Sequence, residues 1–177
     1  TLNLEWFSPT FWKFVLMNSM KIGAIKELPS KNNSPSYIPY NDRFIMGGNG
    51  IPYGNVLRGY DDNRVGPLTA SGNPIGGNTL VKFSTEFRVP FAENPVVYGM
   101  IFAEMGNVWS STDLMERLSL PRSGPLDLKR SVGVGVRFFM PMIGMLGFDF
   151  ARGFDRVDNS GELKPEWKTT LTFGQQF

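Results

Sequence analysis

The stretch Thr79–Pro90 has the sequence TLVKFSTEFRVP, in which apolar and polar side chains alternate. One set of alternate positions is mainly apolar and the other is polar or charged: Val81, Phe83, Thr85, Phe87 and Val89 against Lys82, Ser84, Glu86 and Arg88. An α-helix would scatter these side chains around its axis, whereas a β-strand places every second residue on the same face. The stretch therefore predicts a strand with one apolar and one polar face.

The same alternation recurs along the chain and predicts an all-β protein. We expect seven strands, at residues 2–8, 11–25, 79–90, 96–109, 130–140, 145–154 and 166–177. The clearest of these segments have about the length of a strand that crosses a membrane at a tilt, roughly 9–11 residues. A soluble sandwich buries its apolar faces and a membrane barrel turns them to lipid, so periodicity alone leaves both architectures open.

The connections between these strands alternate between short and long. Short turns are expected at 8–10, 92–95 and 141–144, and long loops at 26–78, 110–129 and 155–165. Such alternation is typical of a membrane barrel, which has short periplasmic turns and longer external loops. The loop 26–78 is too long to serve only as a connection, so we expect it to carry function.

The number of predicted strands is odd and small. Bacterial single-chain barrels have an even number of strands, from eight upward, and lipid tolerates no open sheet edge. The chain starts at Thr1 with a strand-like segment and without a signal peptide. We therefore expect it to be part of a larger antiparallel barrel, with the missing strands N-terminal to Thr1.

Composition narrows the classes of function. The 177 residues contain no histidine and no cysteine, which excludes a Ser-His-Asp triad, a thiolate metal site and a disulfide framework. We expect no catalytic residues, no metal ligands, no cofactor and no enzymatic activity. The net charge of +2 is too balanced to indicate nucleic acid as a partner. Because no run of 18 apolar residues occurs, no transmembrane helix is expected.

The long loop contains the segment Leu57-Arg58-Gly59-Tyr60, shortly after the glycine-rich residues 46–50. Such a tetrapeptide alone indicates no more than a surface turn. In this position it resembles the Val-Arg-Gly-Phe/Tyr motif of the BamA superfamily, also called the bacterial surface antigen family. The resemblance implies that the loop folds back into the barrel lumen, where acidic residues on neighbouring strands hold the arginine.

Two acidic residues match the places where that family carries the partners of its arginine. Glu86 lies on the polar face of the strand after the loop, and Glu104 lies in the next strand. The segment 104–109, EMGNVW, resembles the acidic-x-Gly-x-Val-Trp pattern of the family. An arginine in a confined lumen needs carboxylates because an unpaired charge away from water is costly. The alternative is that both glutamates are solvated lumen charges.

Two features near the C-terminus extend the resemblance. Residues 141–151, PMIGMLGFDFA, are similar to the family's penultimate hairpin, with Met145 in place of its usual proline. The final segment resembles the C-terminal β-signal of outer-membrane barrels, carried here by Trp167, Leu171, Phe173 and Phe177. We expect Gly174 to weaken or kink the last strand at a seam with the first. The alternatives are an ordinary closing strand and a glycine that serves close packing.

The resemblance covers nearly the whole chain and is strongest over residues 42–177. It implies that residues 1–177 form the C-terminal part of one transmembrane β-barrel domain of about sixteen strands. It further implies periplasmic POTRA repeats upstream and a place in the bacterial outer membrane. The implied function is the assembly and insertion of β-barrel proteins, whose strands add to a lateral seam by β-augmentation. Implied partners are unfolded outer-membrane protein clients, accessory assembly lipoproteins and outer-membrane lipid.

Two other functions remain open. A translocation pore, of the two-partner-secretion or TamA type, shares the barrel and the Arg-Gly-Tyr loop. The number of upstream POTRA repeats would distinguish it from an assembly factor. A soluble lipocalin-like binding barrel predicts a dry apolar interior instead, which the charged faces of the predicted strands argue against.

Overall fold

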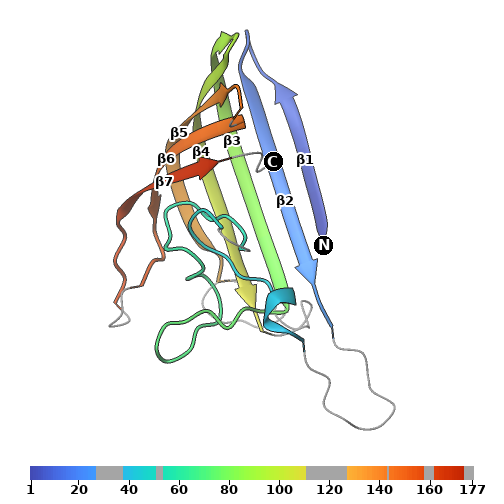
Figure 1. Cartoon of the computed structure of the whole chain (residues 1–177), viewed down its shortest axis with the longest axis vertical. Coiled ribbons are helices and arrows are strands. Elements are labelled where there is room, and N and C mark those ends of the chain that lie inside the picture. The colour runs from blue at the N-terminus through green and yellow to red at the C-terminus, as the bar shows by residue number, and fades with distance from the viewer. Residues whose placement is uncertain (27–37, 51–53, 111–126, 143, 158–161, 174–177) are drawn as a thin grey trace.

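The described part of the protein is built on one antiparallel sheet of seven strands, and each strand pairs with the next in chain order (Figure 1). The computed structural model describes residues 1–26, 38–50, 54–110, 127–142, 144–157 and 162–173. The strands are β1 (Leu2–Pro9), β2 (Val15–Ala24), β3 (Thr79–Glu93), β4 (Val96–Trp109), β5 (Lys129–Met140), β6 (Gly144–Gly153) and β7 (Trp167–Phe173). The prediction of an all-β antiparallel fold with seven strands is confirmed. Within these residues the sheet is open, with β1 and β7 at its two edges.

The alternation of short and long connections is also present. Short turns follow β1, β3 and β5 at one end of the sheet, and long connections follow β2, β4 and β6 at the other (Figure 1). The only helix among the described residues is a single 3₁₀ turn, η1 (Tyr40–Asp42). No helix in the described part is long and apolar enough to cross a membrane.

The expected start of the second strand was wrong. The sequence predicted a strand from residue 11 after a turn at 8–10, but β1 runs through Pro9 and β2 begins at Val15. Trp12 has a left-handed φ of 59°, which interrupts extended backbone. The amide N–H and the hydroxyl of Thr10 both donate to the Phe14 carbonyl, each over 3.0 Å, and close the turn. Residues 11–14, three of which are aromatic, therefore belong to the turn, although aromatic side chains are also common in strands.

The second predicted turn is shorter than expected. β3 continues to Glu93, three residues past the predicted end, and only residues 94 and 95 separate it from β4. Pro90 has no N–H for the ladder, and the pairing with β4 shifts by one residue between Pro90 and Ala92. A bulge at the proline thus allows the strand to continue rather than end.

The two faces of the sheet differ in chemistry, as the period-two pattern predicts. One face exposes large apolar side chains along β4, β5 and β6, among them Ile101 at 62 %, Val134 at 50 % and Phe148 at 49 % exposure. The opposite face curves around a hollow of about 390 Å³ that residues from all seven strands line. We call this hollowed side of the sheet the concave face. Its charged lining does not fit the dry apolar interior of a lipocalin-like barrel.

The loop between β2 and β3 lies on the concave face. Its residues 54–66 are called here the inner loop. Together with Met46, which lies earlier in the same loop, they pack an apolar cluster against β3 and β4: Met46, Leu57, Tyr60, Val65, Leu80 and Val108. Leu57 and Leu80 are fully buried. Burying one side chain of this size stabilises the folded state by about 1.5–3 kcal/mol. This cluster holds the motif of residues 57–60 over the strands that carry the acidic residues.

Candidate functional site

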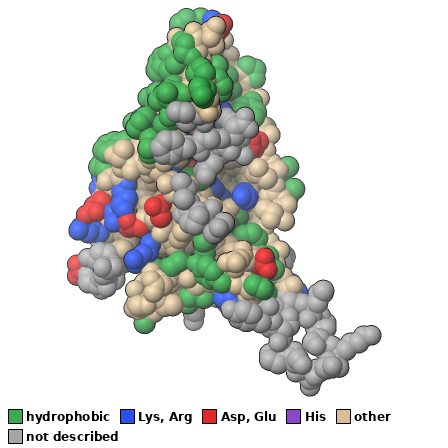
Figure 2. Space-filling view, in the orientation of Figure 1, with side chains coloured by type: hydrophobic (Ala, Val, Ile, Leu, Met, Phe, Trp, Pro, Cys, Tyr) green, Lys and Arg blue, Asp and Glu red, His purple; other side chains and the backbone are tan. Residues whose placement is uncertain are grey.

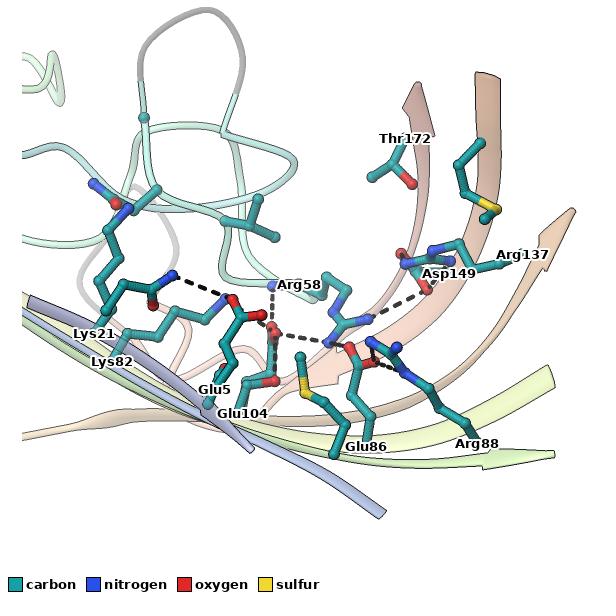
Figure 3. A pocket seen from close by; sticks show the side chains of 18 of the residues that line it. Glu5, Lys21, Arg58, Lys82, Glu86, Arg88, Glu104, Arg137, Asp149 and Thr172 are labelled. Atoms are coloured by element: carbon teal, nitrogen blue, oxygen red, sulfur yellow. Dashed lines mark hydrogen bonds and ion pairs between the residues drawn. The ribbon is translucent and has the colours of Figure 1, made fainter. Parts of the chain in front are cut away.

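Arg58 is the centre of the site on the concave face (Figure 3). Only 3 % of the residue is exposed, because the inner loop carries it down onto the sheet. Its Nη2 atom lies 2.7 Å from Glu86 Oε1 and 2.8 Å from Glu104 Oε1. Its backbone N–H also donates to Glu104 Oε2 over 2.9 Å. The structure therefore brings together the arginine and both acidic residues selected from the sequence.

Further groups surround the Arg58 guanidinium. The Phe102 ring lies beneath it, with 3.5 Å between Cζ and the ring centroid, which is a cation–π geometry. Burial alone lowers the pKa of Arg58, but the carboxylates of Glu104 and Glu86 outweigh it and raise that pKa above its ordinary value. The arginine is thus charged over the whole physiological pH range, and the pairing does not depend on its titration.

Both glutamates have partners besides Arg58. Glu104, which is 4 % exposed, lies 3.1 Å from Lys82 Nζ and accepts a hydrogen bond from the Ser84 hydroxyl over 3.2 Å. Glu86 accepts two hydrogen bonds from Arg88, over 2.9 and 2.7 Å. All four oxygens of these two carboxylates have a donor, so both glutamates are buried and paired rather than solvated lumen charges. Arg58 Nε is the one nitrogen of the guanidinium without a hydrogen-bond partner among the described residues.

A third acid takes part that the sequence analysis did not select. Asp149 on β6 lies 3.6 Å from Arg58 Nη1 and receives two hydrogen bonds from Arg137, over 2.8 and 2.7 Å. The bidentate arginine–carboxylate pair holds Asp149 in place beside Arg58. The sequence held a signal for it, because Asp149 and Arg137 fall on the polar faces of two strands joined by a short turn.

Tyr60 and Gly59 fix the inner loop against β5 and β6. The buried Tyr60 hydroxyl donates to the Arg130 carbonyl over 2.7 Å and accepts from the Asp155 N–H over 3.3 Å. Burial raises the pKa of Tyr60, so the phenol stays protonated and can donate. Gly59 has a φ of +87°, and a Cβ there would lie 2.8 Å from the Gly153 nitrogen. Only glycine therefore fits between the loop and β6.

We expect the substitution Tyr60→Phe to lower the free energy of unfolding by about 1–2 kcal/mol, because it leaves the partly buried Asp155 N–H without its acceptor. The Arg130 carbonyl loses one of its two donors and keeps the Phe154 N–H. The measurement is the midpoint of urea unfolding of the full-length protein in detergent. Tyr98→Phe is the matched control, since the Tyr98 hydroxyl makes no hydrogen bond with the described residues and its ring contact with Arg88 survives. Equal midpoints for the two variants would contradict the assigned role of the hydroxyl.

The C-terminal residues are only partly within the described structure. Trp167 and Leu171 lie on β7, on the same side as Phe150 and Phe148 of the neighbouring strand. The Trp167 ring stacks on Phe150 with centroids 4.6 Å apart. The backbone of Phe173 pairs with Leu146. Gly174 and Phe177 lie outside the described residues, so the seam and the role of Gly174 stay predictions.

Comparison with known proteins places this arrangement in a family. The structure of BamA from Haemophilus ducreyi lacking POTRA domains 1–3 matches with a TM-score of 0.60 at 18 % sequence identity. The match covers 96 % of this chain and 34 % of that one, so the chain spans about a third of its length. No curated protein sequence matches. The model of the Omp85 superfamily domain matches residues 1–177, and the chain therefore belongs to the Omp85 superfamily.

Proposed function

We propose that this chain is the C-terminal part of an outer-membrane barrel that inserts other β-barrel proteins into the bacterial outer membrane. The observation that carries the proposal is the seating of Arg58 on Glu86 and Glu104, on the concave face of a sheet that matches part of a BamA barrel. Membership in the Omp85 superfamily supports a role in protein insertion or translocation at the outer membrane.

The apolar face of the sheet supports contact with lipid. Large side chains on β4, β5 and β6 are exposed next to one another, and a contiguous exposed apolar area of this kind in a soluble protein marks an interaction surface. Figure 2 shows further hydrophobic side chains gathered at the end of the short turns. Outer-membrane barrels turn such a face to the acyl chains and keep polar residues inside.

The proposed mechanism uses an edge of the sheet to accept a client. An edge strand offers N–H and C=O groups in a row, and an extended client segment adds to them as a new strand. The inner loop keeps the strands next to that edge in a fixed arrangement, because it contacts several of them at once. Clients are then unfolded outer-membrane proteins, and accessory lipoproteins are expected to bind parts of the protein beyond this chain.

The test is client folding by the purified full-length protein in liposomes. A urea-unfolded barrel protein is added, and folded client is measured by protease resistance and by its shifted mobility on unheated gels. We expect client folding to accelerate at least about tenfold over empty liposomes, since pairing at an edge lowers the cost of the first membrane-inserted strands.

A parallel assay distinguishes insertion from translocation. Liposomes that hold the same protein are given an unfolded secreted protein, and its arrival inside the vesicles is measured. Transport of that protein without acceleration of client folding would overturn the assembly function in favour of a secretion pore. Acceleration of client folding without transport supports insertion.

A further inference from the structure

A second group of charged side chains joins the inner loop to the last strand. Asp61 directly follows Tyr60, and its Oδ1 atom accepts a hydrogen bond from Lys168 on β7. Its Oδ2 atom accepts from Arg156 Nε over 2.9 Å and lies 2.8 Å from Arg156 Nη2. Arg156 belongs to the connection between β6 and β7. One carboxylate thus holds both the last strand and the segment that leads into it.

The ion pairs continue from Arg156 to the residue that precedes β7. Arg156 Nη1 lies 2.7 Å from Glu166 Oε2, and Lys164 Nζ lies 2.9 Å from Glu166 Oε1. Figure 2 shows acidic and basic side chains gathered on the side of the molecule where this connection lies. A single exposed ion pair contributes little. Here the Arg156 side chain is only 17 % exposed and contacts two carboxylates, which is a connected network.

Three residues of the inner loop contact neighbouring strands of the sheet. Arg58 contacts β3, β4 and β6, and Tyr60 contacts the β5 backbone at Arg130. Asp61 adds β7 through Lys168. Four consecutive loop residues therefore link five consecutive strands, from the middle of the sheet to its edge. Among the described residues β7 has only one hydrogen-bonded neighbour, β6. A contact made outside the strand pairing therefore contributes more to holding such an edge strand in place.

We propose that Asp61 is a positioning residue that fixes the start of β7 against the inner loop. Lys168 is its partner on the strand, and Arg156 holds the carboxylate in the orientation that reaches Lys168. The seated inner loop then adds a second attachment to β7, beside its pairing with β6. The consequence for clients rests on the proposed function, because β7 is one of the two edges at which a client strand would add.

The test is hydrogen exchange of the β7 amides, residues 167–173, in the purified full-length protein in detergent. We expect Asp61→Asn to raise their exchange rate about fivefold or more, since loss of the contact favours local opening of the strand. Exchange in β5, residues 129–140, is expected to stay unchanged. Lys168→Gln is expected to match Asp61→Asn, and the double variant to exchange no faster than either single one.

Asp62→Asn is the matched control, because it removes the same charge one residue further along the loop. The Asp62 carboxylate accepts from the Asn49 N–H and contacts neither Arg156 nor Lys168. Unchanged β7 exchange in Asp61→Asn, an equal rise in Asp62→Asn, additive single variants or a rise in β5 would each overturn the proposal. The hydrogen-exchange measurement requires no client. Its result can therefore be interpreted even if the client-folding test fails.

Discussion

The substitution Arg58→Glu is expected to abolish most client assembly in cells that depend on the full-length protein. It would place a fourth carboxylate beside Glu86, Glu104 and Asp149, all within reach of the present guanidinium. Removing one partner of a buried ion pair costs about 3–5 kcal/mol because the remaining charges stay out of water. That corresponds to a fall of about two to four orders of magnitude in the ratio of seated to released inner loop. The measurement is the amount of folded client barrels in the outer membrane.

Two further variants separate charge pairing from simple misfolding. Arg58→Glu combined with Glu104→Arg restores one opposite-charge pair and is expected to recover part of the assembly. Arg64→Glu makes the same charge change on an exposed arginine of the same loop and is expected to leave assembly near the wild-type level. Full activity of Arg58→Glu would show that the pairing is dispensable, and an equal loss in Arg64→Glu would show that any reversal in this loop is harmful.

The strand pattern was largely predictable because a single physical rule governs it. Period-two alternation placed most strand ends within about three residues, and the sorted faces followed from it. It failed at residues 11–14, where aromatic side chains suit both a strand and a turn. There the left-handed backbone conformation of Trp12 forms the turn. Residues 11–14 contain no glycine or asparagine, the residue types that would indicate such a conformation.

The site was predictable only where local pattern and resemblance met. Glu86 stood on the polar face of its strand, and the resemblance supplied Glu104 and the loop arginine that lies between them. Asp61 and Lys168 could not be connected in this way, since they are 107 residues apart in sequence. Their contact depends on the path of the inner loop across five strands, which no local pattern contains. The approach of Gly59 to Gly153 depends on the same path.

Gly59→Ala is expected to release the inner loop although it adds a single methyl group. At a φ of +87° a side chain alone costs about 1–2 kcal/mol relative to glycine. The added Cβ would also lie 2.8 Å from the Gly153 nitrogen and 3.0 Å from the Arg152 carbonyl carbon. These are backbone atoms of β6, and they cannot move without disturbing the sheet. The strain is therefore relieved by the loop lifting away, which takes Arg58 with it.

Trypsin measures that release directly in the purified full-length protein. Cleavage after Arg58 requires the loop to open, and its rate follows the open population when closing is fast. We expect at least a tenfold faster cut in Gly59→Ala, with cleavage after the exposed Lys26, outside the inner loop, as internal reference. Gly72→Ala is the control, since its φ of +79° carries similar strain but its Cβ meets only the flexible end of the Arg64 side chain. If both variants are cut equally fast after Arg58, strain in the loop rather than contact with β6 governs its seating.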